Sequence, residues 1–243
     1  MKVIIPAAGK GLRLQPMTYF SPKCLVEING KPLLYYLLSS LKTLGVTDVT
    51  IVTGYMHAMI EEYVASSFNF PSVTCINNDH FESTNSIVSI SLTRHLWDGE
   101  FCIIDSDLLV RPPLLEQLIL NNGTYLIVDN SKPAEAIDMK VQVQNARFIF
   151  MDKMLRRKDT FGEFFGLSRW DPESSAILST AIDSYLARGE TNVWYEYAIR
   201  DMATNYSLPI RTCSSEMWCE IDTAEDYSKA IDFATKWRDA FPS

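Results

Sequence analysis

The residues of this chain with the clearest chemical potential lie within its first 26 positions. A short apolar run, Val3 to Ile5, is followed by small residues, which are Ala7, Ala8, Gly9 and Gly11. A loop without side-chain bulk lets backbone N–H groups close around an anion, and their partial charges favour phosphate oxygens. Arg13 adds a planar charge that matches phosphate geometry, and Lys23 adds a second cation. The segment predicts a binding site for a nucleoside triphosphate.

The glycines of this loop also have a simpler interpretation, which stays open at this point. A tight turn between a strand and a helix needs glycine only for its backbone freedom. Two well-known nucleotide motifs are excluded by single positions. A P-loop needs Ser or Thr after Gly-Lys, where this chain has Gly11, and the dinucleotide motif needs a third glycine where this chain has Leu14.

A pair of carboxylates, Asp105 and Asp107, closes a later apolar run, Phe101 to Ile104. Only one of the two is expected to reach a site. A triphosphate arrives with Mg²⁺, whose charge prefers carboxylate oxygens, so we predict a magnesium ligand here. An aspartate that only caps the following turn is the alternative.

The composition excludes several classes of function. The chain has 243 residues, a net charge of −8 and an isoelectric point near 4.9, which argues against nucleic acid as a partner. No apolar run reaches the roughly 18 residues of a membrane span, and the N-terminus lacks the pattern of a signal peptide. The five cysteines form no C-x-x-C pair, which is typical of reduced thiols. We expect a cytoplasmic protein without membrane partners, and no pattern predicts its oligomeric state.

The elements that must position these residues alternate along the first half of the chain. Apolar spacing predicts helices over 33–44 and 59–66, and strands over 49–52, 73–76 and 101–104. Strands that alternate with helices form parallel sheets, in which ligands bind beyond the carboxyl ends of the strands. The loops that follow the strands, after Ile5, Val52, Ile76 and Ile104, are therefore expected to share one edge of the sheet.

The pattern changes after residue 124. Short strands over 125–128, 139–143 and 147–151 predict antiparallel additions to the sheet. A glycine-containing strand over 161–167 follows, then helices over 174–188 and 192–202 and a terminal helix that reaches Phe241. No linker marks a boundary, so we expect a single domain over residues 1–243, in which roughly residues 125–205 form an elaboration.

The combination of G-x-G-x-R-L, P-K-x-L-V-E-I-N-G-K-P-L-L and E-I-D-T-x-x-D-Y resembles the nucleotidyltransferase family, which joins a nucleoside triphosphate to a phosphate monoester. The resemblance runs from Lys2 to about Ala230, and it implies that the elaboration over roughly residues 125–205 binds the phosphate-bearing acceptor. It implies a single Rossmann-like α/β domain with a mixed, mainly parallel sheet, of the nucleotide-diphospho-sugar transferase type. It also implies that the glycine loop, Arg13 and Lys23 bind the triphosphate. Asp107 and Asp222 then hold Mg²⁺, and Asp105 lies beside the nucleotide in a more structural role.

Two further segments are similar to cytidylyltransferases that act on phosphocholine and 2-aminoethylphosphonate. They are the polar loop 77–87 and the stretch N-V-W-Y-E-Y-A-I-R-D-M over 192–202. The similarity implies that Asn77, Asn85 and Ser86 contact the base of CTP, although such a loop also has the ordinary composition of a surface turn. Lys153 lies where the family places the lysine that binds the acceptor phosphate.

Aromatic residues are dense between 170 and 197, and two interpretations stay open. Trp170, Trp194 and Tyr195, together with Glu196, would form a box that receives the ammonium end of the acceptor. Alternatively, aromatic residues at helical spacing serve only to pack the core.

These features predict a magnesium-dependent cytidylyltransferase that joins CTP to a small amine-bearing acceptor, phosphocholine or 2-aminoethylphosphonate, and releases pyrophosphate. Because the attacking oxygen is already ionised, the reaction needs alignment and charge neutralisation more than a general base. One rival is a sugar-1-phosphate nucleotidyltransferase using UTP or dTTP, which needs polar readers of sugar hydroxyls where this chain has Trp194 and Tyr195. The other is a catalytically inactive nucleotide-sensing module, which conflicts with the retention of both cations and both metal-binding aspartates.

Overall fold

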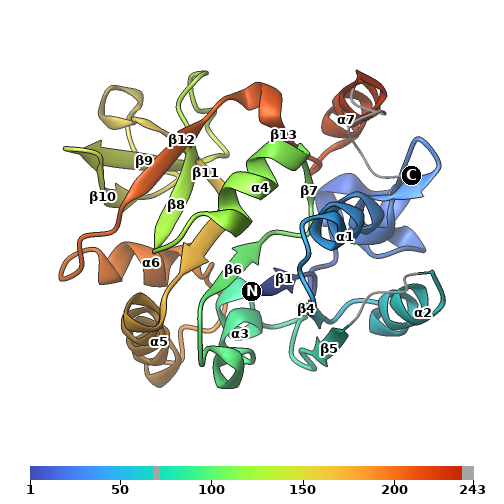
Figure 1. The fold of residues 1–243 in the computed structure, drawn as a ribbon, viewed down its shortest axis with the longest axis horizontal. Helices are drawn as coiled ribbons and strands as arrows, with labels where there is room; N and C mark the ends of the chain where they lie inside the picture. The colour runs from blue at the N-terminus through green and yellow to red at the C-terminus, as the bar shows by residue number, and fades with distance from the viewer. Residues whose placement is uncertain (68–71, 237–243) are drawn as a thin grey trace.

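The computed structural model of the chain describes residues 1–67 and 72–236, and its centre is one sheet of nine strands (Figure 1). Seven strands follow one another in the order β10-β9-β11-β6-β1-β4-β5, and β8 joins β11 to β12. The strands of this sheet are β1 (Lys2–Pro6), β4 (Asp48–Thr53), β5 (Val73–Asn77), β6 (Phe101–Ile104), β8 (Tyr125–Asp129), β9 (Met139–Gln144), β10 (Arg147–Met151), β11 (Gly162–Trp170) and β12 (Ile210–Cys213).

Most strands of the sheet point in one direction. β1 pairs in parallel with β4 and β6, and β4 pairs in parallel with β5. β11 runs antiparallel to β6, β8 and β9, so β8 and β9 share the direction of β6. β12 is parallel to β8, whereas β10 is antiparallel to β9. The predicted α/β fold with a mixed, mainly parallel sheet is confirmed.

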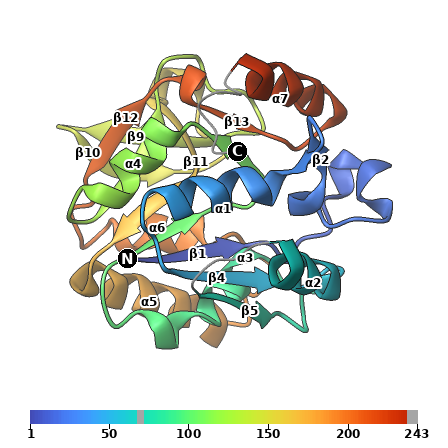
Figure 2. The ribbon, with the colours of Figure 1, turned by 45° about the vertical axis from the view of Figure 1, so that its right-hand side comes forward.

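Alternation along the strands sends side chains into two layers of helices. Val3 and Ile5 of β1 belong to a core that includes α1 (Leu33–Thr43), α2 (His57–Ser67) and α4 (Pro112–Leu120). Ile4 belongs to the core on the other face, with α3 (Ser86–Ser91), α5 (Pro172–Ala187) and α6 (Glu196–Met202). Figure 2 shows α1 and α5 on opposite sides of the strands. Because helices cover both faces, the strands have continuous apolar sequences.

The helix predicted from Asn192 to Met202 begins later than expected. α6 starts at Glu196, and residues 192–195 form a connection that is anchored to α3. The backbone N–H of Tyr195 donates to Ser86 Oγ at 3.0 Å, and that of Ile87 donates to the carbonyl of Val193 at 3.3 Å. These hydrogen bonds to a distant helix replace the first turn of the predicted one. At the other end of the chain α7 spans Ala224–Lys236, and the predicted end at Phe241 lies outside the described residues.

Two short ribbons flank the sheet. β2 (Glu27–Ile28) pairs with β3 (Lys31–Pro32), and β7 (Leu108–Val110) pairs antiparallel with β13 (Trp218–Glu220). In the second ribbon Leu108 faces Glu220, and the N–H of Ile221 donates to the carbonyl of Asp107 at 3.0 Å. This pairing brings residues more than a hundred positions apart to the carboxyl end of β6.

Candidate active site

A cavity of about 520 Å³ lies at the carboxyl ends of β1, β5 and β6. The loop after β4 lies against the first loop of this cavity, because the N–H of Tyr55 donates to the carbonyl of Ala8 at 3.0 Å. The four loops therefore share one edge of the sheet, as predicted. Most of the predicted site residues line the cavity, and these are Ala7, Ala8, Gly9, Gly11, Arg13, Lys23, Asn85, Ser86, Asp105, Asp107, Lys153, Trp194, Glu196 and Asp222.

The two glycines of the first loop serve different purposes. Gly11 has φ +59°, and a Cβ at this position would lie 3.1 Å from Lys23 Cβ and 3.2 Å from Thr18 Cγ2. The fold itself therefore requires glycine there, and the close approach fixes the stem of Lys23. Gly9 has neither constraint, since a Cβ would meet nothing within 4 Å. Its missing side chain leaves open space on the cavity wall, which suits the close approach of a ligand to the backbone.

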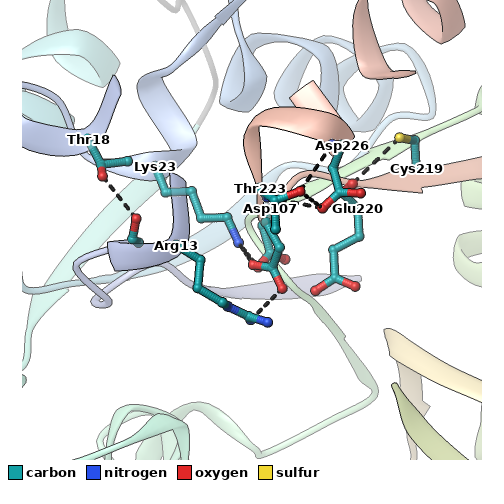
Figure 3. A network of polar contacts seen from close by, with 10 residues as sticks. Arg13, Thr18, Lys23, Asp107, Cys219, Glu220, Thr223 and Asp226 are labelled. Atoms are coloured by element: carbon teal, nitrogen blue, oxygen red, sulfur yellow. Dashed lines mark hydrogen bonds and ion pairs between the residues drawn. The ribbon is translucent and has the colours of Figure 1, made fainter. Parts of the chain in front are cut away.

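The charged side chains of both ends of the chain converge on one point of this cavity. Figure 3 shows Arg13 and Lys23 extending toward the acidic side chains beside β13. Lys23 Nζ lies 2.6 Å from Asp107 Oδ2 and also forms an ion pair with Asp222. Arg13 pairs with the second oxygen of Asp222. The predicted convergence of two early cations and two distant acids is present in the structure.

The pKa values of Lys23, Asp222 and Glu220 in this cluster are shifted by burial and by neighbouring charges. Burial alone would lower the pKa of Lys23, but Asp107 and Asp222 raise it above its usual value, so the ammonium stays charged. Burial would raise the pKa of Asp222, but Lys23 and then Arg13 hold it below its ordinary value. Glu220 is different, because burial and the charges of Asp107 and Asp222 raise its pKa well above the usual range. The cluster holds more acid than its two cations balance.

Three carboxylates in this cluster fit a divalent metal ion. Oxygens of Asp107, Glu220 and Asp222 lie within 4.8 Å of one another. Oxygens around Mg²⁺ sit at about 2.1 Å from the ion, so opposite ligands are about 4.2 Å apart, which this spacing accommodates. The sequence patterns did not single out Glu220 as a candidate ligand. Its signal was the alternation Glu220-Ile221-Asp222, which places the two acids on one side of an extended segment and Ile221 in the core.

Asp105 also lines the cavity but lies apart from these three acids. Its carboxylate occupies the space above Gly166, where a Cβ would come within 2.3 Å of Asp105 Oδ2. Gly166 has φ +95° and sits where the pairing of β11 with β8 changes register. Tyr195 Oη donates to Asp105 Oδ1 at 3.4 Å. This geometry agrees with a structural role for Asp105, and the predicted contact with the nucleotide remains a prediction.

The loop predicted to read the base is placed only in part as expected. Asn85 caps α3 by accepting from the N–H of Ser86 at 2.8 Å, and both residues line the cavity. Asn77 does not line it, which corrects our prediction, because its amide turns to Asp79. Asn78 takes the place on the wall, and its amide donates to Thr84 and Ser89, each at 3.2 Å.

The predicted aromatic box is wrong in two of its members. Trp170 has no exposed surface, and its Nε1 donates to Ser168 Oγ at 2.9 Å within the core of β11. Tyr195 is 1% exposed and supports Asp105 from behind the cavity wall. Trp170 lies in the fully buried strand β11, and the hydrogen bond of Tyr195 to α3 turns its ring inward, so both rings pack instead of lining the cavity.

Trp194 and Glu196 do line the cavity, but a cation of the chain already occupies the ring. Lys153 Nζ lies 4.4 Å from the centre of the Trp194 ring. Burial raises the pKa of Glu196 to about 7, although Lys153 acts in the opposite direction. The structure thus brings the predicted acceptor lysine together with the remaining box residues, and the lysine fills the face that was assigned to the acceptor's ammonium group.

The sequence pattern of one protein family, described as nucleotidyl transferase, matches residues 2–124, which is 123 of the 243 residues. The chain belongs to this family. The cluster of cations and acids therefore sits in a nucleotidyltransferase fold.

Individual relatives are similar over nearly the whole chain. Choline-phosphate cytidylyltransferase of Streptococcus pneumoniae (strain ATCC BAA-255 / R6) is 26% identical, over 94% of this chain and 96% of that protein. The 2-aminoethylphosphonate cytidylyltransferase of Lancefieldella rimae is 23% identical, over 92% and 89%. Among solved structures, the inositol-1-phosphate CTP transferase from T. maritima has a TM-score of 0.82 at 18% identity, over 100% of this chain and 98% of that one, so the fold is shared.

No helix within residues 1–67 and 72–236 is long and apolar enough to cross a membrane.

Proposed function

We propose that this chain is a cytidylyltransferase, which joins CTP to a small amine-bearing phosphate or phosphonate and releases pyrophosphate. The observation that carries the proposal is the meeting of Arg13, Lys23 and three carboxylates beside the glycine loop. CTP as the nucleotide, and phosphocholine or 2-aminoethylphosphonate as acceptor, are supported by the names of relatives that are similar over the full chain.

Mg²⁺ is the proposed metal, with Asp107, Glu220 and Asp222 as its ligands. These oxygens are hard donors of the kind that a divalent cation prefers. When bound, such an ion neutralises phosphate charge and aligns the triphosphate for displacement. Lys23 now pairs with two of the same carboxylates, so its ammonium is placed to turn toward a phosphate when those oxygens take a metal.

The residues of the first loop bind and orient the triphosphate. The open wall at Gly9 lets backbone groups reach phosphate oxygens. Arg13 is more than half exposed, so its guanidinium has room to turn from Asp222 toward the β- and γ-phosphates. Lys23 is partly buried at the junction with the acids and supplies charge near Pα. Negative charge that develops on the leaving pyrophosphate is thereby neutralised by fixed groups.

Lys153 orients the acceptor. It lines both the main cavity and a narrow extension of it, so an acceptor phosphate beside Lys153 has one oxygen facing the nucleotide. That oxygen attacks Pα in line, the bond from Pα to the bridging oxygen of pyrophosphate breaks, and no proton has to be removed. Alignment by these side chains supplies the main acceleration.

A matrix of four nucleoside triphosphates against a panel of acceptors tests the proposal. The panel contains phosphocholine, phosphoethanolamine, 2-aminoethylphosphonate and glucose 1-phosphate, and pyrophosphate release is measured with and without Mg²⁺. We expect release with CTP and an amine-bearing acceptor only. Preference for UTP or dTTP with the sugar phosphate would favour the sugar-1-phosphate rival, and no release with any pair would favour the inactive sensing module.

We also propose a cytoplasmic location. All five cysteines are free thiols in the structure, and burial raises the pKa of each, for example that of Cys24 to about 12. Such thiols persist in a reducing compartment.

A further inference from the structure

The main cavity continues past Lys153 into a second large cavity. A narrow extension of about 70 Å³ shares Lys153, Trp194, Glu196 and the acids of β13 with the main cavity. The same extension shares Asp138, Glu163 and Trp218 with an outer cavity of about 670 Å³. An acceptor whose phosphate lies at Lys153 therefore points its other end at Glu163 and Trp218.

At this end the chain places an ammonium group of its own. Lys132 Nζ lies 5.1 Å from the centre of the Trp218 ring and 3.1 Å from Glu163 Oε1. The other face of Trp218 stacks on Phe165, with ring centres 3.8 Å apart and planes within 7°. The indole N–H of Trp218 donates to Asp129 at 3.1 Å, which fixes the ring. Carboxylate and ring form a rigid receptor for a cation.

The contact between Lys132 and Glu163 joins a fixed group to a movable one. The Glu163 side chain is only 4% exposed, whereas that of Lys132 is 43% exposed and enters from the outer cavity. Glu163 Oε1 is buried without a hydrogen bond of good geometry among the described residues, although the ammonium is near. A buried carboxylate oxygen in this state favours a better-aligned N–H donor. The outer cavity carries Glu135, Asp138 and Asp226, which can receive the lysine if it leaves.

We propose that the Lys132 ammonium is a placeholder for a primary ammonium group of the acceptor, which displaces it and binds between Glu163 and Trp218. This inference rests on the proposed function and narrows it to acceptors that end in –CH2–NH3⁺. The end of a lysine side chain has the same chemistry as the end of 2-aminoethylphosphonate or phosphoethanolamine. The assignment moves the ammonium site away from Trp194, whose ring is already covered by Lys153.

A quaternary ammonium group fits this receptor less well. Trimethylammonium has no N–H, so it leaves Glu163 Oε1 without a hydrogen bond in a buried position. It is also bulkier than the lysine ammonium that the site now holds. We therefore expect the enzyme to prefer phosphoethanolamine over phosphocholine, although both carry a positive charge.

The first part of the test uses the unaltered protein with CTP and Mg²⁺. KM and kcat are measured for 2-aminoethylphosphonate, for its amine-free isostere propylphosphonate, for phosphoethanolamine and for phosphocholine. We expect the KM for 2-aminoethylphosphonate to be at least tenfold below that for propylphosphonate. We expect the KM for phosphoethanolamine to be at least tenfold below that for phosphocholine. Equal kcat/KM for phosphocholine and phosphoethanolamine would overturn the inference but leave the proposed function intact. No pyrophosphate from any acceptor defeats the proposed function itself.

The second part compares variants whose folding is checked by thermal melting. Glu163→Gln should raise KM for 2-aminoethylphosphonate about 10- to 100-fold and leave KM for propylphosphonate and CTP unchanged. Lys132→Met should lower KM for 2-aminoethylphosphonate several-fold, because the competing ammonium is gone. Lys229→Met, in the same outer cavity but paired with Glu225, is the matched control and should change neither value.

Two results of the variant experiment would overturn the inference. The first is a rise in KM for 2-aminoethylphosphonate in Lys132→Met, which would mean that the lysine helps to bind the acceptor. The second is an equal rise for the amine and its isostere in Glu163→Gln, which is expected if Glu163 only maintains the shape of the extension.

Discussion

The two ends of the active site are built from the same kinds of charge but in opposite ways. At the phosphate end, two cations form ion pairs with Asp107 and Asp222, and a third acid, Glu220, lies beside them. At the acceptor end, Lys153 and Lys132 each lie over a tryptophan ring, with Glu196 and Glu163 beside them. The first end is suited to a metal and a polyanion. The second is suited to a short molecule with a phosphate at one tip and an ammonium at the other.

The comparison shows what a motif can and cannot specify. Residues of the phosphate end lie in two compact segments and one loop, and the β7–β13 ribbon brings them together. The acceptor end is assembled from β11, the segment after β8, β13 and the start of α6, which no short pattern connects. Substitutions at each end can therefore test whether the transfer reaction depends on the phosphate end and binding of the acceptor depends on the acceptor end.

The largest effect is expected for Asp222→Asn, which removes a charge that contacts both cations and faces the proposed metal. We expect kcat to fall about 100- to 1,000-fold, in the range typical of a lost group that stabilises transition-state charge. The protein should stay folded, since Lys23 keeps Asp107 as a partner. Asp98→Asn removes an exposed ion pair to Lys2 and serves as control. Near-normal kcat in Asp222→Asn would remove the residue from the chemistry.

Gly166→Ala tests the close packing of β11 against the Asp105 carboxylate, which lies between the two ends of the site. A Cβ there would lie 2.3 Å from the Asp105 carboxylate at a backbone angle of φ +95°. We expect unfolding free energy to fall by about 2–4 kcal/mol, from steric overlap added to backbone strain. Gly123→Ala, with φ +86° and open space around it, isolates the backbone part, which should cost about 1 kcal/mol. Urea unfolding of both variants measures the difference, and equal losses would contradict the assigned overlap.

Glu163 at the acceptor end should make the protein less stable as pH rises. Burial, then Asp138, raises the pKa of Glu163 to about 8 from an ordinary value of 4.5, although Lys132 acts against this. Between these values the acceptor-free folded chain holds a proton that the unfolded chain has lost, so stability falls as pH increases. An acceptor ammonium beside Glu163 would favour release of this proton. Between pH 5 and 8.5, the free energy of unfolding measured in urea should fall by about 1–3 kcal/mol less in Glu163→Gln than in the wild type. An identical decline in both proteins would place the titration elsewhere.

The smallest effect is expected for Gly9→Ala at the phosphate end. Its Cβ would enter open cavity, so the melting temperature should stay unchanged while KM for CTP rises about tenfold, or about 1.4 kcal/mol. KM for the acceptor should not change. Gly99→Ala, also with open space but away from the cavity, is the control. A loss of stability in Gly9→Ala, with KM for CTP unchanged, would assign the glycine to the fold alone.

Periodicity and motifs predicted the sheet and the phosphate end well. Phe101–Ile104 was predicted as a strand with its observed bounds, and the helix predicted from Leu33 begins there. Repeated apolar runs determine these elements locally. The family motifs around Arg13, Lys23, Asp107 and Asp222 predicted that these residues meet, and the pairing of β13 with β7 brings Asp222 to the carboxyl end of β6.

Other features depend on packing that local sequence does not reveal. Every residue of β11 is buried, so no alternation distinguished Trp170 in the core from residues facing the cavity. Tyr195 was assigned to the pocket because its neighbours Trp194 and Glu196 are there, but hydrogen bonds to α3 turn it inward. The role of Trp218 emerges only once Lys132 and Phe165 are seen on its two faces.

The most direct test of the central claim follows ³¹P resonances while the protein acts on CTP, Mg²⁺ and 2-aminoethylphosphonate. The account predicts that the β- and γ-phosphates leave together as pyrophosphate, and that Pα appears in a new anhydride with the phosphonate, one for one. Both changes should stop with EDTA or in Asp222→Asn. Release of inorganic phosphate without pyrophosphate, or undiminished turnover in EDTA, would contradict a metal-assisted nucleotidyl transfer at these residues.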